Sequence, residues 1–564
     1  METKVCQNCK SEFHILPEDF KFYEKMNVPP PTFCPECRLQ RRLLIYNERS
    51  LYKGICALCK KEIISCYPAD TPLKVYCTPC WWSDGWDDLE YGKEYDPSRP
   101  FFDQLHELIL KTPHAALQVD YPSLINSDYI NAAGHIKNCY LIYTADFCEN
   151  VMYSSLLVRN KDSADSILLR DSERCYGNIN CTKCYGTHFS EDSDNCVDVM
   201  FSKNCSGCSN CFGCINLKGK KYHIFNEPYS KEEYVKKITE FRLDSFAALE
   251  QIREKVFSFW KSQPHKFMHE RHSVNVSGDY VINSKSAKNV YLVRGVEDGK
   301  FCQVITFGPA KDVYDYTVWG NNAELIYECL GVGENARNVK FSFNCWPNSY
   351  DVEYSWWCVS SSNIFGCANV KRKQYCILNT QYPKEEYEAL KARIVEDMNA
   401  RPYVDKKGRS FAYGEFFPYD FSPFGYNETM AADFLPISRE EAEAKGFFWR
   451  EDRPSAYVPT MAVANLPDSI NDTQDTIVDE IIECSACKKP YRVIDRELSL
   501  LRQLNLPLPR TCLNCRHKER ISRMNPPRLW SRACAKCGTT IETSYAPGRQ
   551  EIIYCRECYQ REVI

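Results

Sequence analysis

The sequence predicts a multidomain protein in which two cysteine-rich modules flank a duplicated, mainly β body that carries capping helices. Three observations support this fold class. Cys-x-x-Cys pairs occur near both ends of the chain, short units containing Asn or Asp recur through its middle, and a 23-residue segment of the body occurs twice. At 564 residues the chain is long enough for several domains.

The two cysteine-rich modules contain the same array of four Cys-x-x-Cys pairs. Adding 478 to the number of each cysteine in the first array gives a cysteine of the second array, all eight times. Residues 1–82 and 481–564 are therefore predicted to be two copies of one double module. The arrays consist of Cys6, Cys9, Cys34, Cys37, Cys56, Cys59, Cys77 and Cys80, and of Cys484, Cys487, Cys512, Cys515, Cys534, Cys537, Cys555 and Cys558.

These spacings predict zinc. Each pair can form a tight turn that presents two thiolates, and two pairs supply the four sulfur ligands of a tetrahedral zinc site. Four-cysteine sites of this kind favour zinc over iron, whereas disulfides are favoured in small secreted chains. We expect about four Zn²⁺ ions with a structural role, because four thiolates leave no open coordination position. The pairs can be joined sequentially or interleaved, and the helical pattern of residues 38–44, directly after Cys37, favours sequential pairing.

The first half of the N-terminal array also contains Phe13, Phe22-Tyr23, Lys25 and Cys34-Pro35-Glu36-Cys37-Arg38. With these residues it resembles the probable zinc-ribbon domain family of uncharacterised bacterial proteins. The C-terminal copy has Leu500-Leu501 in place of Phe22-Tyr23 and resembles that family less closely. The chain as a whole is similar to large uncharacterised bacterial zinc-ribbon proteins. The resemblance implies zinc-ribbon or treble-clef-like modules and bound zinc, and it implies no reaction.

Between the modules, short units such as Lys137-Asn138-Cys139-Tyr140 and Lys288-Asn289-Val290-Tyr291 recur, and the closest are 9 to 13 residues apart. This period is too short for helical repeats and is typical of one strand plus a corner. Asn and Asp tolerate the left-handed backbone of a corner, and the residue after them can point inward. We interpret residues 124–228 and 272–400 as two stretches of parallel β-solenoid-like structure, the second ending in a capping helix.

The segment that occurs twice supports this interpretation. Residues 212–234 align with residues 365–387 at a shift of 153, with 14 of 23 positions identical. Each copy ends where a helix begins, and such helices can cover strand edges that would otherwise be unpaired. The remaining segments are predicted to be a linker with an amphipathic helix (83–123), a helical segment (229–271), an aromatic and proline-rich strap (401–456) and a second linker (457–480).

Six cysteines of the body leave three interpretations open. Their spacing fits buried thiols, a further zinc site or an iron–sulfur cluster. No run of 18 apolar residues occurs and no leader precedes Cys6, so we expect no membrane span and no export. Abundant thiols then favour a reducing cytoplasm. The six are Cys181, Cys184, Cys205, Cys208, Cys211 and Cys214.

Charge suggests a partner for the C-terminal module. Residues 481–564 carry a formal charge of +8, whereas the whole chain carries −4. If a helix follows Cys515, then Arg516, Arg520 and Arg523 share one of its faces and can contact successive phosphates. We therefore predict a non-catalytic scaffold that binds nucleic acid or a ribonucleoprotein through this module. The predicted contact residues are Arg516, Lys518, Arg520, Arg523, Arg528 and Trp530.

Two alternatives stay open. The first is an enzyme that acts on a polymer such as a polysaccharide in a groove of the body, and the second is a scaffold for protein partners alone. No Gly-rich phosphate loop, nucleophile elbow or metal set with an open position occurs in the sequence, so no catalytic residue is predicted.

Overall fold

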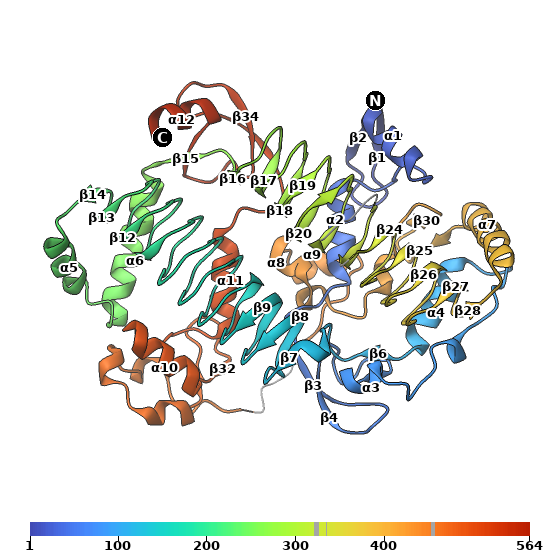
Figure 1. Cartoon of the computed structure of the whole chain (residues 1–564), viewed down its shortest axis with the longest axis horizontal. Helices are drawn as coiled ribbons and strands as arrows, with labels where there is room; N and C mark the ends of the chain where they lie inside the picture. Colours follow the sequence, from blue (N-terminus) through green and yellow to red (C-terminus); the bar gives the residue numbers. More distant parts are fainter. Residues whose placement is uncertain (321–325, 334, 453–456, 564) are drawn as a thin grey trace.

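The structure, a computed structural model, describes residues 1–320, 326–333, 335–452 and 457–563. Residues 321–325 and 334 of the predicted second stretch, 453–456 of the predicted strap and 564 lie outside the described residues. The body is a mixed α/β structure with parallel sheets, and a cysteine module lies at either end of the chain (Figure 1). Within the described ranges, no helix is both long and apolar enough to cross a membrane.

The first stack, residues 124–228, consists of short strands that pair in parallel with the segment twelve residues further along the chain, except that the last strand, β14, pairs antiparallel with β13. Ile130 lies opposite Ile142, Tyr143 opposite Ser155 and Val197 opposite Ser209. Isolated bridges keep the same offset between β10 and β11. The strands are β7 (Leu124–Ile125), β8 (Ile130–Lys137), β9 (Ile142–Glu149), β10 (Ser155–Val158), β11 (Val197–Met200), β12 (Ser209–Phe212), β13 (Lys221–Ile224) and β14 (Glu227–Pro228).

The second stack, residues 270–381, has the same parallel pairing with a less regular offset. Gly278 lies opposite Val290, twelve residues on, whereas Gln303 lies opposite Thr317 and Arg337 opposite Tyr350. Its strands are β16 (Glu270–Arg271), β17 (Gly278–Ile282), β18 (Val290–Arg294), β19 (Val296–Glu297), β20 (Gln303–Phe307), β21 (Ala310–Lys311), β22 (Thr317–Gly320), β23 (Leu330–Gly333), β24 (Arg337–Lys340), β25 (Tyr350–Glu353), β26 (Ser362–Phe365), β27 (Gln374–Ile377) and β28 (Thr380–Gln381). The last strand of the second stack, β28, pairs antiparallel with β27, as β14 does with β13.

Corners in the first stack occur at every third residue, where the backbone is left-handed. Asn138, Asn150, Asn195 and Asn204 of the recurring units all have φ close to +50°, a conformation that Asn tolerates better than most residues. The residues that follow these four corners, Cys139, Val151, Cys196 and Cys205, are buried. Each turn of chain therefore needs small interior side chains at a period of three, which explains why the units look alike.

Small polar and thiol side chains fill much of this interior and bond to the backbone. Ser154, for example, donates its hydroxyl to Met152 O and accepts from the backbone N of Ser166 in the next turn. The six body cysteines are buried, and each thiol donates to the carbonyl two residues earlier. Among the described residues, the groups that could hold a metal ion include none of these six. The geometry therefore favours the buried-thiol interpretation.

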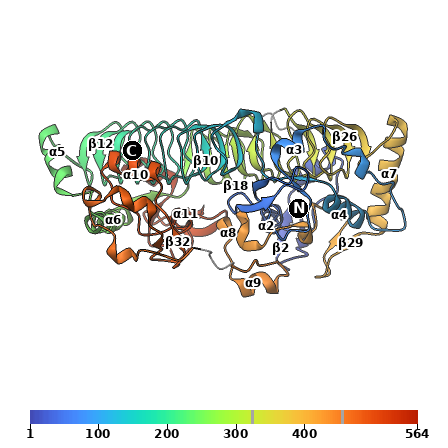
Figure 2. The ribbon, with the colours of Figure 1, turned by 90° about the horizontal axis from the view of Figure 1, so that it is seen from below.

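The twice-occurring segment has the same secondary structure at both places. Strands β12, β13 and β14 recur as β26, β27 and β28 at the shift of 153, and a helix follows each set. These helices, α5 (Lys231–Glu240) and α7 (Lys384–Ala400), lie at opposite ends of the layer that the two stacks form (Figure 2). Helix α6 (Phe246–Lys261) follows α5 and leads toward the second stack.

The two modules repeat their elements at the shift of 478. The N-terminal module contains β1 (Glu2–Val5), β2 (Glu12–Ile15), α1 (Pro17–Lys25), α2 (Pro35–Leu44), β3 (Tyr52–Ile55), β4 (Glu62–Ser65), β5 (Val75–Tyr76) and α3 (Thr78–Trp82). The C-terminal module contains β31 (Ile482–Glu483), β32 (Pro490–Tyr491), α10 (Asp495–Leu504), α11 (Leu513–Arg523), β33 (Trp530–Ala533), β34 (Thr540–Thr543), β35 (Ile552–Tyr554) and α12 (Arg556–Val563). The helix expected after Cys37 is α2.

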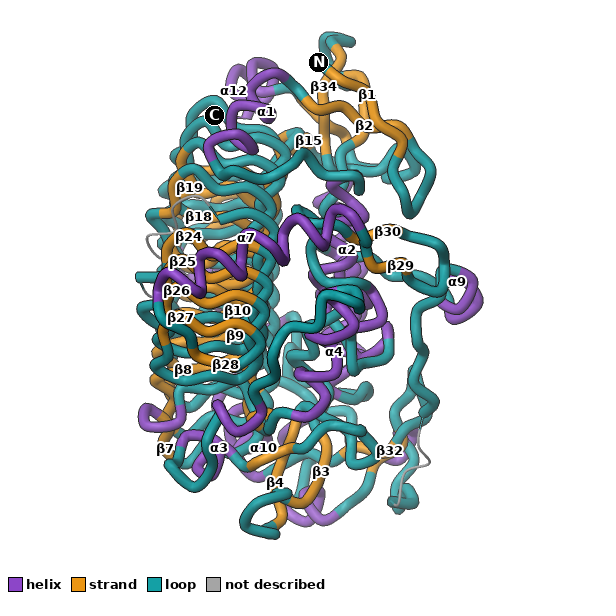
Figure 3. The backbone as a smooth tube through the Cα atoms, turned by 90° about the vertical axis from the view of Figure 1, so that its right-hand side faces the viewer, coloured by secondary structure: helices purple, strands orange, loops and turns teal. Residues whose placement is uncertain are grey.

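Figure 3 shows the strand layer on the left and helices α2 and α4 (Phe101–Lys111) with the strap on the right. The amphipathic helix predicted in 83–123 is α4, whose Phe102 and Leu105 are buried. The strap packs on its neighbours: Phe411 stacks near Phe33 and Phe417 contacts Trp356. It contains β29 (Tyr403–Val404), β30 (Ser410–Phe411), α8 (Met430–Phe434) and α9 (Arg439–Ala444).

The segment expected to be a linker, residues 457–480, differs from that expectation over much of its length. Leu466, Ile470 and Ile477 are buried in the cluster that includes side chains of α6 and α10. Three apolar residues spaced along a polar stretch are enough to hold it against those helices, because each side chain removes apolar area from water.

The interior of the first stack can be tested at Asn178, whose Nδ2 donates to Thr187 O (2.8 Å) and whose Oδ1 accepts from Ser190 N (2.9 Å). Replacing Asn178 with Leu leaves the buried backbone N of Ser190 unpaired, whereas Thr187 O keeps the bond that it accepts from Tyr176 N. We therefore expect a loss of about 1–3 kcal/mol in the free energy of unfolding, measured in urea. Lys183→Leu at an exposed corner is the control and should change it by less than about 0.5 kcal/mol. An Asn178→Leu protein as stable as the unsubstituted chain would contradict this packing.

Candidate metal centres and the cleft between the stacks

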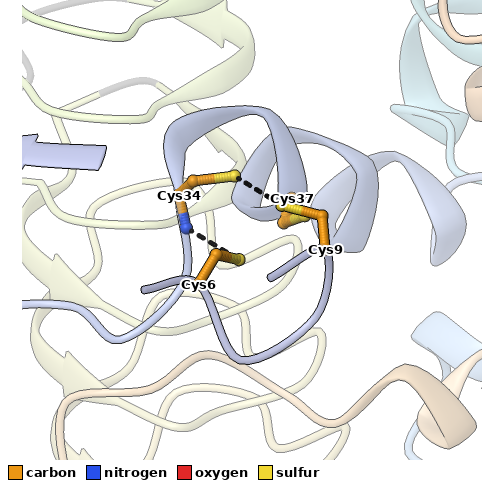
Figure 4. Close-up of side chains that lie close together, drawn as sticks. All are labelled: Cys6, Cys9, Cys34 and Cys37. Carbon is orange, nitrogen blue, oxygen red and sulfur yellow. Dashed lines mark hydrogen bonds between the residues drawn. The ribbon is translucent and has the colours of Figure 1, made fainter. Parts of the chain in front are cut away.

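Four groups of four cysteines could each hold a metal ion. They are Cys6, Cys9, Cys34 and Cys37; Cys56, Cys59, Cys77 and Cys80; Cys484, Cys487, Cys512 and Cys515; and Cys534, Cys537, Cys555 and Cys558. Within each group the four sulfur atoms lie within 4.8 Å of one another. The grouping follows chain order, which is the sequential pairing that the helix after Cys37 favoured. Figure 4 shows the first group at the start of α2.

The sulfur positions fit a tetrahedral ion. Zinc–sulfur bonds of about 2.3 Å place neighbouring sulfur atoms about 3.8 Å apart. The Cys9–Cys34, Cys59–Cys77, Cys487–Cys512 and Cys537–Cys555 sulfur pairs lie 3.7, 3.8, 3.7 and 3.8 Å apart. These distances are those expected between two sulfur ligands of one zinc ion, and four thiols would fill all four of its coordination positions.

The backbone around each group also favours thiolates. In every group the first sulfur accepts a bond from the backbone N of the third cysteine, as Cys6 Sγ does from Cys34 N at 3.3 Å. Burial raises the pKa of the Cys56, Cys484 and Cys534 thiols, but backbone N–H groups aimed at each sulfur outweigh it and lower the pKa to about 6. Zinc bound there would supply a structural cross-link and no open position for chemistry.

Helix α2, which begins at the second pair of the first group, inserts three arginines into the second stack. Arg38, Arg41 and Arg42 are fully buried. Arg38 donates Nη2 to Asp315 Oδ1 (3.1 Å), and Arg42 Nη1 lies 3.2 Å from Asp315 Oδ2. Arg41 Nη2 lies 2.8 Å from Glu328 Oε1. The first cysteine group thus lies at the start of a basic helix that packs against buried carboxylates.

Helix α11 likewise packs three arginines against carboxylates of the first stack. Arg516 Nε and Arg520 Nη1 each lie 3.2 Å from an oxygen of Asp165, and Arg523 Nε lies 3.0 Å from Glu191 Oε1. Arg516 also donates to Glu497 of α10 at 2.8 Å. The basic face expected to contact phosphates is therefore turned toward the body, where carboxylates compensate its charge.

The other residues of the predicted nucleic-acid set lie elsewhere. Lys518 and Arg528 are exposed, and Trp530 is half-buried with the Arg528 guanidinium 5.8 Å from its ring. Arg528 also lies 3.8 Å from Glu36. Binding of nucleic acid by this module stays a prediction.

The two arginine sites occupy corresponding positions. Arg38 and Arg42 correspond to Arg516 and Arg520 at the shift of 478. Parallel partners lead from Ala164 through Tyr176, His188 and Met200 to Phe212, and from Tyr314 through Tyr327, Lys340 and Glu353 to Phe365. Phe212 and Phe365 are equivalent in the twice-occurring segment, so Asp165 and Asp315, the next residues after Ala164 and Tyr314, are equivalent too.

Each module also pairs a strand with the segment just before the stack that its arginine helix does not contact. Strand β5 pairs in parallel with β6 (His114–Ala115), just before the first stack, and β35 pairs in parallel with β15 (Pro264–Lys266), just before the second. Each module therefore contacts both stacks, one through its helix and the other through its strand.

A buried histidine joins three segments of the chain at the C-terminal module. His269 Nδ1 lies 2.9 Å from Asp279 Oδ1, and its Nε2 lies 3.4 Å from Asp192 Oδ2 and 3.3 Å from the Tyr545 hydroxyl. Burial lowers the pKa of His269, but the two carboxylates outweigh it and raise the pKa to about 10. The sequence could not predict this pairing, because the two aspartates come from different stacks.

A cleft of about 840 Å³ lies where the N-terminal module meets both stacks. The first stack contributes Gly134, His135 and Asp146, and the second contributes Trp319, Asn344 and Trp346. Trp82 is the last residue of the module, and Trp86 follows in the segment 83–123. His135 Nδ1 lies 3.0 Å from Asp146 Oδ1. Burial raises the pKa of Asp146, and His135 partly offsets this rise. No sequence pattern brought these residues together, because they come from three segments far apart in the chain.

Comparison with known proteins leaves the family open: no protein-family model matches the chain, and no curated protein is significantly similar to it. The cysteine groups are consistent with zinc-ribbon-like modules, and metal binding is the property that the site itself supports.

The buried arginine site on the second stack predicts that removing one carboxylate strongly lowers the free energy of unfolding. Replacing Asp315 with Ala leaves the buried guanidiniums of Arg38 and Arg42 without their shared partner, so we expect unfolding in urea to show a loss of about 3–5 kcal/mol. Asp312→Ala is the matched control, because Asp312 pairs with the exposed Lys25 and should cost about 0–1 kcal/mol. Equal effects of the two substitutions would contradict the buried arginine site.

His269 predicts a pH-dependent contribution to stability. Its pKa of about 10 in the folded protein lies above the ordinary value of 6.5, so its charge stabilises the fold fully below pH 6.5 and progressively less as pH rises toward 10. We expect the stability difference between the unsubstituted protein and His269→Gln, measured in urea, to shrink between pH 6.5 and 10. His14→Gln at an exposed site should show no such trend. A difference that does not vary with pH would contradict the assignment.

Proposed function

We propose that this protein is a metal-stabilised scaffold in which four structural zinc ions hold two modules across a β-solenoid body. The offset of twelve residues and the left-handed corners at every third residue support a parallel β-solenoid. The corresponding elements at shifts of 153 and 478 support internal duplication of both body and modules.

The observation that carries the proposal is the double attachment of each module. Helix α2 reaches the second stack through Arg38 and Asp315, while β5 of the same module extends a strand beside the first stack. In the C-terminal module, helix α11 reaches the first stack through Arg516 and Asp165, and β35 pairs with β15 beside the second stack. A chain built in this way fixes two long stacks side by side, which is the task of a scaffold. Four filled thiolate sites supply cross-links rather than a reaction centre.

Metal content and metal loss test the proposal. The purified protein should contain close to four zinc ions per chain, because four groups of thiols fit a tetrahedral ion. Replacing Cys34 with Ser should remove one ion and release α2, since a structural zinc site supplies folding energy. Hydrogen exchange should then rise both in residues 6–37 and around Asp315 and Glu328 of the second stack.

Cys208→Ser is the control, because Cys208 is a buried thiol outside the four groups, and it should keep close to four ions. A content near two, or stoichiometric iron, would contradict the metal assignment. Exchange that rises in the module alone would show that α2 does not hold the second stack.

A further inference from the structure

The cleft offers aromatic surface that its own chain leaves partly uncovered. Trp82, Trp86 and Trp319 are half-buried and line it together with Trp346, which packs edge-on against Trp319 at 5.3 Å between ring centroids. Flat indole faces of this kind form favourable contacts with the C–H faces of ring compounds. A volume of about 840 Å³ suits a ligand larger than a single metabolite headgroup, at the upper end of ordinary small-molecule sites.

Two buried side-chain amides at the cleft have hydrogen-bonding atoms without partners among the described residues. Gln118 is 5% exposed, and neither its Nε2 nor its Oε1 has a hydrogen-bond partner in the described part of the chain. Asn344, also 5% exposed, has an Nδ2 without a partner there. An unpaired buried polar group costs about 1–3 kcal/mol. A ligand that offers donors and acceptors together, as hydroxyl groups do, would satisfy both amides.

Charge at the cleft disfavours an anionic ligand. Asp120 and Asp146 lie on either side of Gly134, where an added Cβ would be 3.4 Å from Asp120 Cβ and 3.5 Å from Asp146 Oδ1. Lys371 donates to Trp81 O at 2.8 Å, and Lys373 pairs with Asp88 at 3.2 Å, so both lysines are engaged within the protein. Arg372 is the remaining basic residue lining the cleft, and it is exposed. Phosphates and uronates would meet the two carboxylates with repulsion.

We propose that this cleft binds a neutral oligosaccharide, whose ring faces stack on the tryptophans and whose hydroxyl groups bond to Gln118, Asn344 and the two carboxylates. The proposal rests on the scaffold function above, because the N-terminal module supplies Trp82 and the second stack supplies Trp319. Carboxylates and amides bond to hydroxyl groups as acceptors and donors, and four aromatic rings along one cleft suit a chain of several sugar units.

The test uses the full zinc-loaded chain and a panel of neutral hexasaccharides: cellohexaose, maltohexaose, xylohexaose, mannohexaose and chitohexaose. Titration calorimetry and tryptophan fluorescence should detect binding of at least one of them. Hexagalacturonate, a dT oligonucleotide and hexalysine are the anionic and cationic comparisons, and each should bind at least tenfold more weakly than the best neutral sugar.

Two variants tie that binding to the cleft. Gln118→Leu should weaken it at least tenfold without lowering thermal stability, since the substitution removes a buried amide that has no partner among the described residues. Trp319→Ala should weaken it further. Trp530→Ala, which removes a half-buried indole outside the cleft, is the control and should leave binding unchanged.

Three results would overturn the proposal: no neutral sugar of the panel binds, an anionic or cationic comparison binds best, or binding is unaffected by Gln118→Leu. Zinc content is measured on the same samples. A protein that holds close to four ions and binds no sugar contradicts the ligand alone, whereas a protein with too few ions contradicts the scaffold itself.

Discussion

The buried pairing of arginine with aspartate, once on each stack, is the contact on which the rest of this structure depends. Removing a guanidinium and a carboxylate from water costs several kcal/mol per ion, and good geometry is needed to offset it. Arg38 and Arg42 share Asp315, and Arg516 and Arg520 share Asp165, so each aspartate is bonded from two sides. The attraction within such a pair does little more than offset the cost of desolvating its two ions, so the pair adds little to the stability of the fold. It does fix the position of each helix on its stack.

The arginine–aspartate pairs need other contacts to hold the arginines in this geometry, and the cysteine groups lie where they can supply them. Cys34 and Cys512 stand at the N-termini of α2 and α11, so the thiols that would hold an ion also fix the direction of each helix. A structural zinc site contributes roughly 10–16 kcal/mol of apparent binding energy, more than enough to hold three ordered arginines. The modules have small cores of their own, which is why the energy has to come from metal and from docking.

Local patterns in the sequence predicted the local parts of this structure. The four cysteine groups and α2 follow from short spacings, and the corners follow from Asn residues that tolerate positive φ. The packing of the α11 arginines against the first stack could not be predicted, because the compensating Asp165 lies about 350 residues away in the chain. Gln118 and Trp319 meet at the cleft only after the stacks have docked, so no spacing could have joined them.

The shape of the cleft depends on the same contacts between the N-terminal module and the two stacks. Trp82 belongs to the helix that carries Cys80, Trp319 belongs to the second stack, and Asp146 belongs to the first. No one of these segments forms the site alone, and the contacts that bring them together are those of the N-terminal module with both stacks. A ligand bound across the cleft would touch all three, so it would favour the docked state by its own binding free energy. Metal binding and ligand binding would then stabilise one arrangement of the chain and reinforce each other. The two thiol groups of the N-terminal module are thus part of the physical basis of the site, although none of their sulfur atoms lines it.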